Sequence, residues 1–363
     1  MRRQAVDPAK PVEVPPYVRL LLWSLLSGAL AVFGQRIIQA QPLDYTFADM
    51  LPIIQIMGER WLLGEEVYAV IPEIWDGMQP IYLPMLWLSY VPALLLEVDI
   101  RWTNVVAMII VSALVLDVFS RRSWRPVQLA VLLPLLILLS YIFIVYSTFL
   151  SISEEPIVLL AYMLLGYGLW KKRAGLLVFA LAACPLSRYA LVFWAICWWG
   201  YQWWQGDRKH AWVIAVGSAG LAVLALWMSQ GLGQLELFYS LKDAFLDSFT
   251  PQLAWRTQNT VNNNLGLARF VPFAWLPGPH RLLFWGSLVL PVLIYIWYHL
   301  RLRMRISAPL FALCSLKLCL VFFFNFNPLP YSYLFCTSTF LSLLVFGLVM
   351  EKQYTSEGVE RRS

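Results

Sequence analysis

Residues 39–101 read QAQPLDYTFADMLPIIQIMGERWLLGEEVYAVIPEIWDGMQPIYLPMLWLSYVPALLLEVDIR and form the first extended segment between two apolar runs that are long enough to cross a membrane. This segment holds nine of the chain's 21 carboxylates. An ionised carboxylate that is drawn towards hydrocarbon loses hydration, so membrane proteins keep such groups mainly where they act. The segment therefore predicts the active-site loop of a membrane-embedded enzyme.

The composition excludes an ordinary soluble domain. Of the 363 residues, 60% are hydrophobic and only 13% are charged, and the mean hydropathy is +0.66. The apolar runs are continuous and not alternating, which favours membrane-spanning helices over barrel strands. The net charge of +6 comes from short Lys/Arg clusters at the ends of these runs, so it indicates membrane topology, and no nucleic-acid partner is expected.

The five cysteines lie in apolar segments, without CxxC spacing and without a nearby histidine: Cys184, Cys197, Cys314, Cys319 and Cys336. This pattern predicts buried free thiols and favours neither disulfides nor a metal site.

Ten apolar runs are predicted to span the membrane as a single domain, residues 17–350, between cytoplasmic tails at 1–16, expected to be disordered, and 351–363. For the first run a secretory signal is the alternative, because Arg2 and Arg3 precede it and Ala29-Leu30-Ala31 loosely fits a cleavage site; the long preamble favours an uncleaved anchor. The predicted spans are Tyr17–Ile38, Trp102–Phe119, Val127–Thr148, Pro156–Trp170, Ala174–Pro185, Tyr189–Trp204, Ala211–Met228, Leu282–His299, Ala308–Phe324 and Tyr331–Met350.

The distribution of basic residues orients these spans. With both termini cytoplasmic, 18 Lys/Arg fall on the cytoplasmic side and seven on the other side, which carries the two long loops, residues 39–101 and 229–281. This assignment requires that Tyr82–Val98 does not cross the membrane. We expect a juxtamembrane helix there, with Pro84 in its first turn, although its apolar length would also allow a crossing.

Within the first loop, Phe47–Leu63 has the apolar spacing of a helix that lies on the membrane surface. Pro52 confines its start, and Gly64 suits its end. Asp49 then lies at the beginning of this helix. Asp49, or Asp44 five residues earlier, would also serve as a simple cap that satisfies the helix start.

The order of elements in this loop resembles that of a known family. After a first span come Asp49, a helix closed by Gly64, Tyr68, and then Tyr82-Leu83-Pro84 opening a second apolar helix. This pattern is similar to the GT-C superfamily of membrane glycosyltransferases, above all the polyprenol-phosphate-mannose-dependent mannosyltransferases. Weaker similarities continue through residues 171–194, Asn262–Gly266 and Asn327–Tyr331.

The resemblance implies an inverting transferase that moves mannose or another sugar from a polyprenyl-phosphate donor to a glycan or glycolipid acceptor on the noncytoplasmic face. It implies that Asp49 is the general base on the acceptor hydroxyl, with Asp44 as the alternative. Asp49 is followed by Met50, so the double-acid motif of metal-using relatives is absent and we expect neither a metal nor another cofactor. The compact loops favour a bacterial cytoplasmic membrane.

The lipid phosphate departs as an anion, so we expect cations that bind it on the noncytoplasmic side of the membrane. Arg188 stands where the family usually has a lysine, and its planar guanidinium can hold a phosphate. An ordinary interfacial arginine is the alternative. Further candidates for substrate binding are Arg256, Asn264 and Arg269 in the second long loop, Lys317 within an apolar run, and the motif residues Tyr82 and Tyr331.

Some residues depart from the family pattern. Leu83 replaces the first proline of a common Tyr-Pro-Pro, Ser153-Glu154-Glu155 replaces a frequent Gly-Gln-x-Asn turn, and Pro330 replaces a histidine. Two other function classes stay open: a transporter or flippase, which the many spans would suit, and a scaffold without chemistry. The absence of an internal repeat and the placement of charge in the loops favour the transferase.

Overall fold

The protein is an α-helical membrane protein. The computed structural model describes residues 15–45, 50–74, 77–120, 126–188, 192–236, 238, 266–272, 275, 277–302, 306–326 and 334–360. Within these ranges the chain forms helices and a single isolated antiparallel bridge between Ile71 and Met78, and no strand. The predicted tail at residues 1–16 falls almost wholly outside the described residues.

Each predicted span contains a helix. Among the described residues, five helices are long and apolar enough to cross a membrane by themselves, namely Pro16–Ala40, Arg101–Val118, Arg208–Met228, Arg281–Leu302 and Ala308–Asn325. The helices that follow the ten predictions are α1 (Pro16–Ala40), α5 (Arg101–Ser120), α6 (Pro126–Ser140), α8 (Glu155–Lys171), α9 (Ala174–Ser187), α10 (Val192–Trp204), α11 (Arg208–Met228), α14 (Pro277–Trp297), α15 (Ala308–Phe326) and α16 (Leu334–Glu360).

Several helix ends differ from the sequence prediction, and α14 begins at Pro277, five residues before the predicted start at Leu282. Helix α9 continues past Pro185 to Ser187, because a proline has a helical φ and removes only one backbone hydrogen bond. Helix α16 extends ten residues beyond Met350, through a polar segment that apolar periodicity does not detect. Short π-helical turns, η2 (Tyr141–Val145) and η7 (Tyr298–Leu302), prolong α6 and α14.

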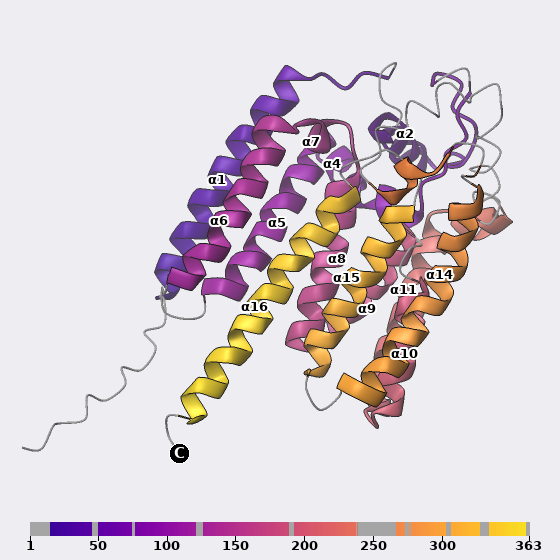
Figure 1. Ribbon diagram of the computed structural model, residues 1–363. Coiled ribbons are helices and arrows are strands. Elements are labelled where there is room, and N and C mark those ends of the chain that lie inside the picture. Colours follow the sequence, from indigo (N-terminus) through magenta and orange to yellow (C-terminus); the bar gives the residue numbers. More distant parts are fainter. Residues whose placement is uncertain are drawn as a thin grey trace, which may run out of the picture.

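The long helices run side by side, and the short elements collect at one end of the bundle (Figure 1). Helices α2, α4 and α7 lie there, whereas the start of α1 and the end of α16 lie at the opposite end. We call the first of these the loop end. The short elements of the chain are α2 (Met50–Leu63), α3 (Pro84–Trp87), η1 (Leu88–Tyr90), α4 (Val91–Leu95), α7 (Thr148–Ser151), η4 (Gly231–Gln234) and η5 (Leu267–Phe270).

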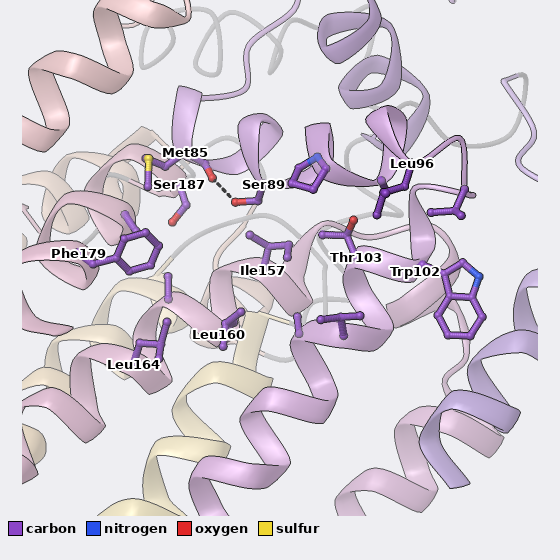
Figure 2. Close-up of a pocket in the computed structure, with 17 residues that line it drawn as sticks. Met85, Ser89, Leu96, Trp102, Thr103, Ile157, Leu160, Leu164, Phe179 and Ser187 are labelled. Carbon is purple, nitrogen blue, oxygen red and sulfur yellow. Dashed lines mark hydrogen bonds between the residues drawn. The ribbon is translucent and has the colours of Figure 1, made fainter. Parts of the chain in front are cut away.

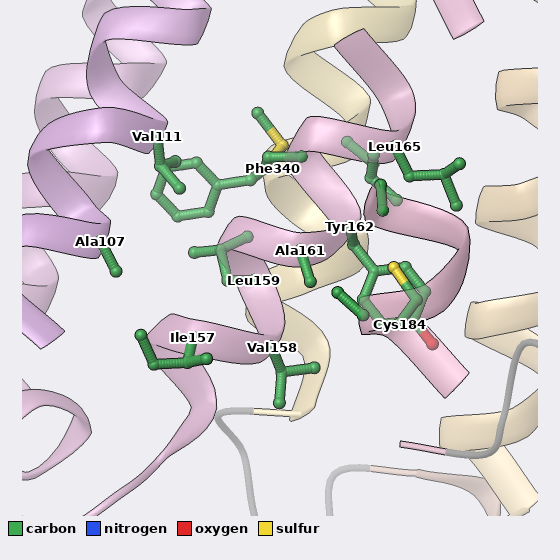
Figure 3. Packing of buried hydrophobic residues seen from close by; sticks show 14 of the residues in the cluster. Ala107, Val111, Ile157, Val158, Leu159, Ala161, Tyr162, Leu165, Cys184 and Phe340 are labelled. Atoms are coloured by element: carbon green, nitrogen blue, oxygen red, sulfur yellow. The ribbon is translucent and has the colours of Figure 1, made fainter. Parts of the chain in front are cut away.

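Helix α8 is the centre of the bundle. It packs against α5, α9, α15 and α16, and most of its residues are buried. Figure 3 shows its apolar side chains between Val111 of α5, Cys184 of α9 and Phe340 of α16. A Cβ on Gly166 would come within 2.9–3.0 Å of leucine side chains on α15 and α16, so this glycine permits the close approach of the three helices.

The first loop contains two short helical units at the loop end. Helix α2 buries Ile54 and Met57, as the apolar spacing predicted, and ends before Gly64, whose φ of +74° is the left-handed conformation that favours glycine. Elements α3, η1 and α4 together cover residues 84–95. At 1.5 Å per residue this is about 18 Å, and the 3-10 turn η1 interrupts the α-helix between α3 and α4.

All five cysteines are free, as predicted. Cys184 and Cys319 are buried, and Cys197 and Cys336 are partly buried. The prediction of burial is wrong for Cys314, which is exposed on the surface of α15. In a membrane-spanning helix the exposed face meets lipid hydrocarbon, so an apolar sequence does not distinguish a lipid-facing thiol from a buried one.

Arg101 closes the first loop at its base. Its guanidinium is only 4% exposed, forms an ion pair of 2.5 Å with Asp99, and donates hydrogen bonds to the carbonyls of Ile38 and Gln41 at the end of α1. Burial of Asp99 by itself disfavours the charged form, but the hydrogen bonds and the charge of Arg101 outweigh it and hold the pKa of Asp99 below its ordinary value. One side chain therefore joins both ends of the 39–101 segment.

Replacement of this side chain should loosen the loop. We expect Arg101→Ala to lower the free energy of unfolding by about 3 kcal/mol, because it leaves Asp99 and two carbonyls without their buried partner. The measurement is the apparent unfolding temperature of the purified protein in detergent. Arg36→Ala removes an exposed arginine near the end of the same helix α1 and should stay within about 0.5 kcal/mol of wild type. Equal effects of the two changes would contradict the assigned role of Arg101.

Candidate functional site

A cluster of three charged side chains, two of them buried, lies at the loop end, where α8 begins and α9 ends. Arg188 Nη2 lies 2.9 Å from Glu154 Oε1 and 2.7 Å from Glu155 Oε2. The side chain of Arg188 is 20% exposed, that of Glu154 is 6% exposed and that of Glu155 is wholly buried. Two carboxylates thus share one guanidinium nitrogen, and the arginine has the most exposed side chain of the three.

A network of neutral polar groups holds this charged cluster in place. The Glu155 amide donates to Ser153 Oγ over 3.0 Å at the first turn of α8, and Thr337 of α16 makes a long contact of 3.5 Å to the Glu155 carboxylate. Asn104 of α5 donates to the carbonyls of Leu150 and Ser153, and accepts a hydrogen bond of 2.7 Å from the Tyr90 hydroxyl. Four helical elements therefore position the start of α8.

A groove of about 400 Å³ runs beside the cluster. Figure 2 shows Met85, Ser89 and Leu96 of the α3–α4 segment above it, Ile157, Leu160 and Leu164 of α8 along its floor, and the two flanks formed by α5 and α9. Nearly all the lining side chains are apolar. Leu96 and Val106 are exposed at its edge, so the groove opens onto the surface of the helix bundle. At its α9 flank it reaches Ser187, the residue before Arg188.

The two long loops contact each other at the loop end. Trp61 Nε1 donates to the carbonyl of Met228 over 2.7 Å, and the Gln230 side chain bonds the Glu65 carbonyl and the Val67 amide over 2.9 and 3.2 Å. The rings of Tyr68 and Phe238 pack edge to face, with centroids 5.5 Å apart. The first loop is therefore fixed to the beginning of the second.

The family-like residues of the first loop also meet. The Tyr68 hydroxyl lies 3.3 Å from the Tyr82 carbonyl, to which it donates, and accepts from Trp87 Nε1 over 3.3 Å. Burial raises the pKa of Tyr68 to about 12 despite the opposing hydrogen bonds of Trp87 and Ser229. Tyr68 is consequently a neutral phenol near pH 7, suited to holding the loop and not to accepting a proton.

Five of the nine predicted site residues are described. Asp44 is exposed in the segment after α1, Tyr82 is partly buried before α3, and Arg188 belongs to the charged cluster. Arg269 is exposed in η5, with its guanidinium carbon 5.1 Å from the ring centre of Phe270. Lys317 is partly buried in the middle of α15, nine residues or about 13 Å before the helix ends, so the structure does not bring it to the cluster. Asp49, Arg256, Asn264 and Tyr331 lie outside the described residues.

The sequence prediction missed Glu154 and Glu155. It treated Ser153-Glu154-Glu155 only as a departure from the family pattern, whereas the structure places both carboxylates against Arg188. One signal was available. Two adjacent carboxylates precede Pro156 at the very start of an apolar segment, where an unpaired charge would be costly, and such a pair requires a buried partner.

Among the described residues, no three His, Cys, Asp or Glu side chains are grouped as a metal would require. The expected metal independence stays a prediction, since Asp49 lies outside the described residues.

Comparisons of the chain with protein-family models, with curated proteins and with solved structures give no match. The fold defines an α-helical membrane protein with a buried ion cluster beside an apolar groove. The function has to be inferred from this site and from the sequence motifs.

The ion cluster makes a prediction about stability. Arg188→Ala should lower the free energy of unfolding by about 3–5 kcal/mol, because two buried carboxylates lose their counter-charge. The triple change Glu154→Gln, Glu155→Gln and Arg188→Met removes all three charges and should be clearly less destabilising than Arg188→Ala alone. Thermal unfolding in detergent measures both. A triple variant less stable than Arg188→Ala would contradict this expectation. It would show that the three charges together make a net contribution to stability and do not merely neutralise one another.

Proposed function

We propose that this protein is an inverting glycosyltransferase that transfers a sugar from a polyprenyl-phosphate donor to an acceptor at the noncytoplasmic face of the membrane. In this proposal all ten long helices cross the bilayer, both termini are cytoplasmic, and the loop end is the noncytoplasmic end. The membrane is a bacterial cytoplasmic membrane. The acceptor is a glycan or glycolipid, and the reaction needs no metal.

The observation that carries the proposal is the groove. Its volume of about 400 Å³ falls in the range of about 300–1,000 Å³ that is usual for ligand sites. Its lining is apolar, it is open at Leu96 and Val106, and it reaches Ser187, the neighbour of Arg188 in the chain. A polyprenyl phosphate matches this arrangement, because it has an apolar chain that lies in the bilayer and a phosphate at the end of that chain.

The chemistry requires a base on the acceptor side and a cation on the donor side. In our proposal Asp49 takes the proton of the acceptor hydroxyl while its oxygen attacks the anomeric carbon. The bond from that carbon to the phosphate oxygen breaks, and the phosphate keeps the oxygen and its electron pair. Arg188 holds the phosphate. Asp49 directly precedes Met50, the first residue of α2, and α2 packs on the α3–α4 segment that covers the groove.

The arrangement of the first loop supports the family resemblance. Gly64 ends α2 in a left-handed conformation, and Tyr68 contacts the backbone of Tyr82 just before the helix that Pro84 begins. Gly64, Tyr68 and Tyr82, which the motif relates only by their order along the sequence, are thus parts of one folded unit. This is the arrangement that a common role in one site would require.

Loss of the proposed base should abolish transfer. We expect Asp49→Asn to lower sugar transfer at least a hundredfold, because an amide cannot take the acceptor proton, while expression and membrane insertion stay normal. The assay follows radiolabelled sugar from a polyprenyl-phosphate donor into product in proteoliposomes. Asp44→Asn is the matched control and should retain most activity.

The outcome of this pair assigns the base or rejects it. Full activity of Asp49→Asn together with inactivity of Asp44→Asn would move the role to Asp44. Movement of lipid-linked solute across the vesicle membrane without any covalent product would favour the alternative, a transporter or flippase.

Filling the groove should affect long donors more than short ones. Ala161→Leu on its α8 floor or Ala183→Leu on its α9 flank should raise KM for a long-chain donor several-fold and leave a short-chain donor nearly unchanged, because only the long chain occupies the groove. Ala219→Leu, on an exposed face of α11, is the control. Equal effects on the KM values of long and short donors would show that the groove does not bind the donor chain.

A further inference from the structure

Glu155 has no direct part in the proposed transfer, yet it lies next to the arginine that would hold the phosphate. Its carboxylate is wholly buried and 2.7 Å from Arg188 Nη2, so it touches no substrate. An anion bound to the exposed part of the Arg188 side chain would be separated from the Glu155 carboxylate only by the guanidinium group. The negative charge of Glu155 would therefore repel it. A buried carboxylate in this position affects which anions the arginine can accept.

Sugar transfer changes the charge of the donor phosphate. In the intact donor the phosphate is a diester with one negative charge. When the bond from the anomeric carbon to the phosphate oxygen breaks, the lipid keeps a phosphate monoester that has gained one more charged oxygen. Since the second pKa of such monoesters is near 6, the product carries close to two negative charges above pH 7.

We propose that Glu155 is a specificity-determining residue that makes the Arg188 site prefer the singly charged phosphate diester of the donor over the doubly charged monoester that transfer leaves behind. This inference rests on the proposed function, and it concerns the charge of the phosphate and the release of the lipid product. The repulsion between Glu155 and the second charge of the monoester weakens product binding.

Burial raises the pKa of the Glu155 carboxyl to about 7, although the charge of Arg188 opposes this rise, so the carboxyl is mostly charged at pH 8. Glu154 on the preceding residue and Arg188 on α9 are the charged neighbours among the described residues. The other titratable groups are Tyr90 on η1, Tyr162 on α8, Cys184 on α9 and Cys336 on α16, phenols and thiols that are neutral near pH 7. Glu155 also lies in the first turn of α8, where the positive end of the helix dipole favours a negative charge.

The test compares two lipids of equal chain length, a polyprenyl phosphate and its methyl diester, with the full-length protein in nanodiscs at pH 8. The ratio of their dissociation constants should favour the diester in wild type. In Glu155→Gln, which keeps the shape of the side chain and removes its charge, this ratio should fall about tenfold, as one interaction between unit charges in a partly screened site implies. Inhibition of transfer by added polyprenyl phosphate should strengthen to the same extent.

Two further variants serve as controls for effects of the substitution on folding. Glu154→Gln should lower the ratio in the same direction, since Glu154 contacts the same nitrogen. Asp117→Asn, a matched change at the Tyr167 contact between α5 and α8, should leave the ratio unchanged. An unchanged ratio in a Glu155→Gln protein that still transfers sugar would overturn the inference and leave the proposed function standing. Absence of transfer in wild type, with neither lipid bound, would overturn both.

Discussion

Two carboxylates and one guanidinium are buried together at the start of α8, and the loop end of the protein is built around this cluster. Each of these groups loses several kcal/mol of hydration when it leaves water, so none of them is stable there alone. The sharing of Arg188 by Glu154 and Glu155 fixes the end of α9 against the beginning of α8. Contacts from Thr337 and from the Tyr90–Asn104 pair then bring α16, α5 and η1 to the same point.

The same constraint explains why the α3–α4 segment lies across the bundle. Tyr90 places its hydroxyl on Asn104, and Asn104 holds the turn that leads into α8. At the other end of the first loop, Arg101 bonds the last carbonyls of α1, and Gln230 attaches the loop to the segment after α11. The short apolar α3–α4 segment is therefore held at the loop end by polar contacts, and the groove beneath it is a consequence of that placement.

The groove and the cluster combine two environments that seldom adjoin. One is lined by apolar side chains, and the other is charged and includes the partly exposed side chain of Arg188. The donor that we propose, a polyprenyl phosphate, likewise combines an apolar chain with an anionic group. Under our proposal the carboxylates beside Arg188 limit how much negative charge that group carries.

The sequence alone was sufficient for the class of fold and for the approximate positions of the long helices, because continuous apolar runs of membrane length have few alternatives to helices. It also predicted the surface helix that ends at Gly64, since apolar spacing and a glycine stop are local signals. By contrast, the partners of Arg188 lie 33 and 34 residues away along the chain, and Gln230 meets the first loop across more than 160 residues. Periodicity and composition describe one helix at a time and carry no information on which charged ends meet. Only the tertiary packing of α8 against α9 and α16 decided that Glu154 and Glu155 would be buried on Arg188, because pairing is the condition under which those carboxylates can leave water.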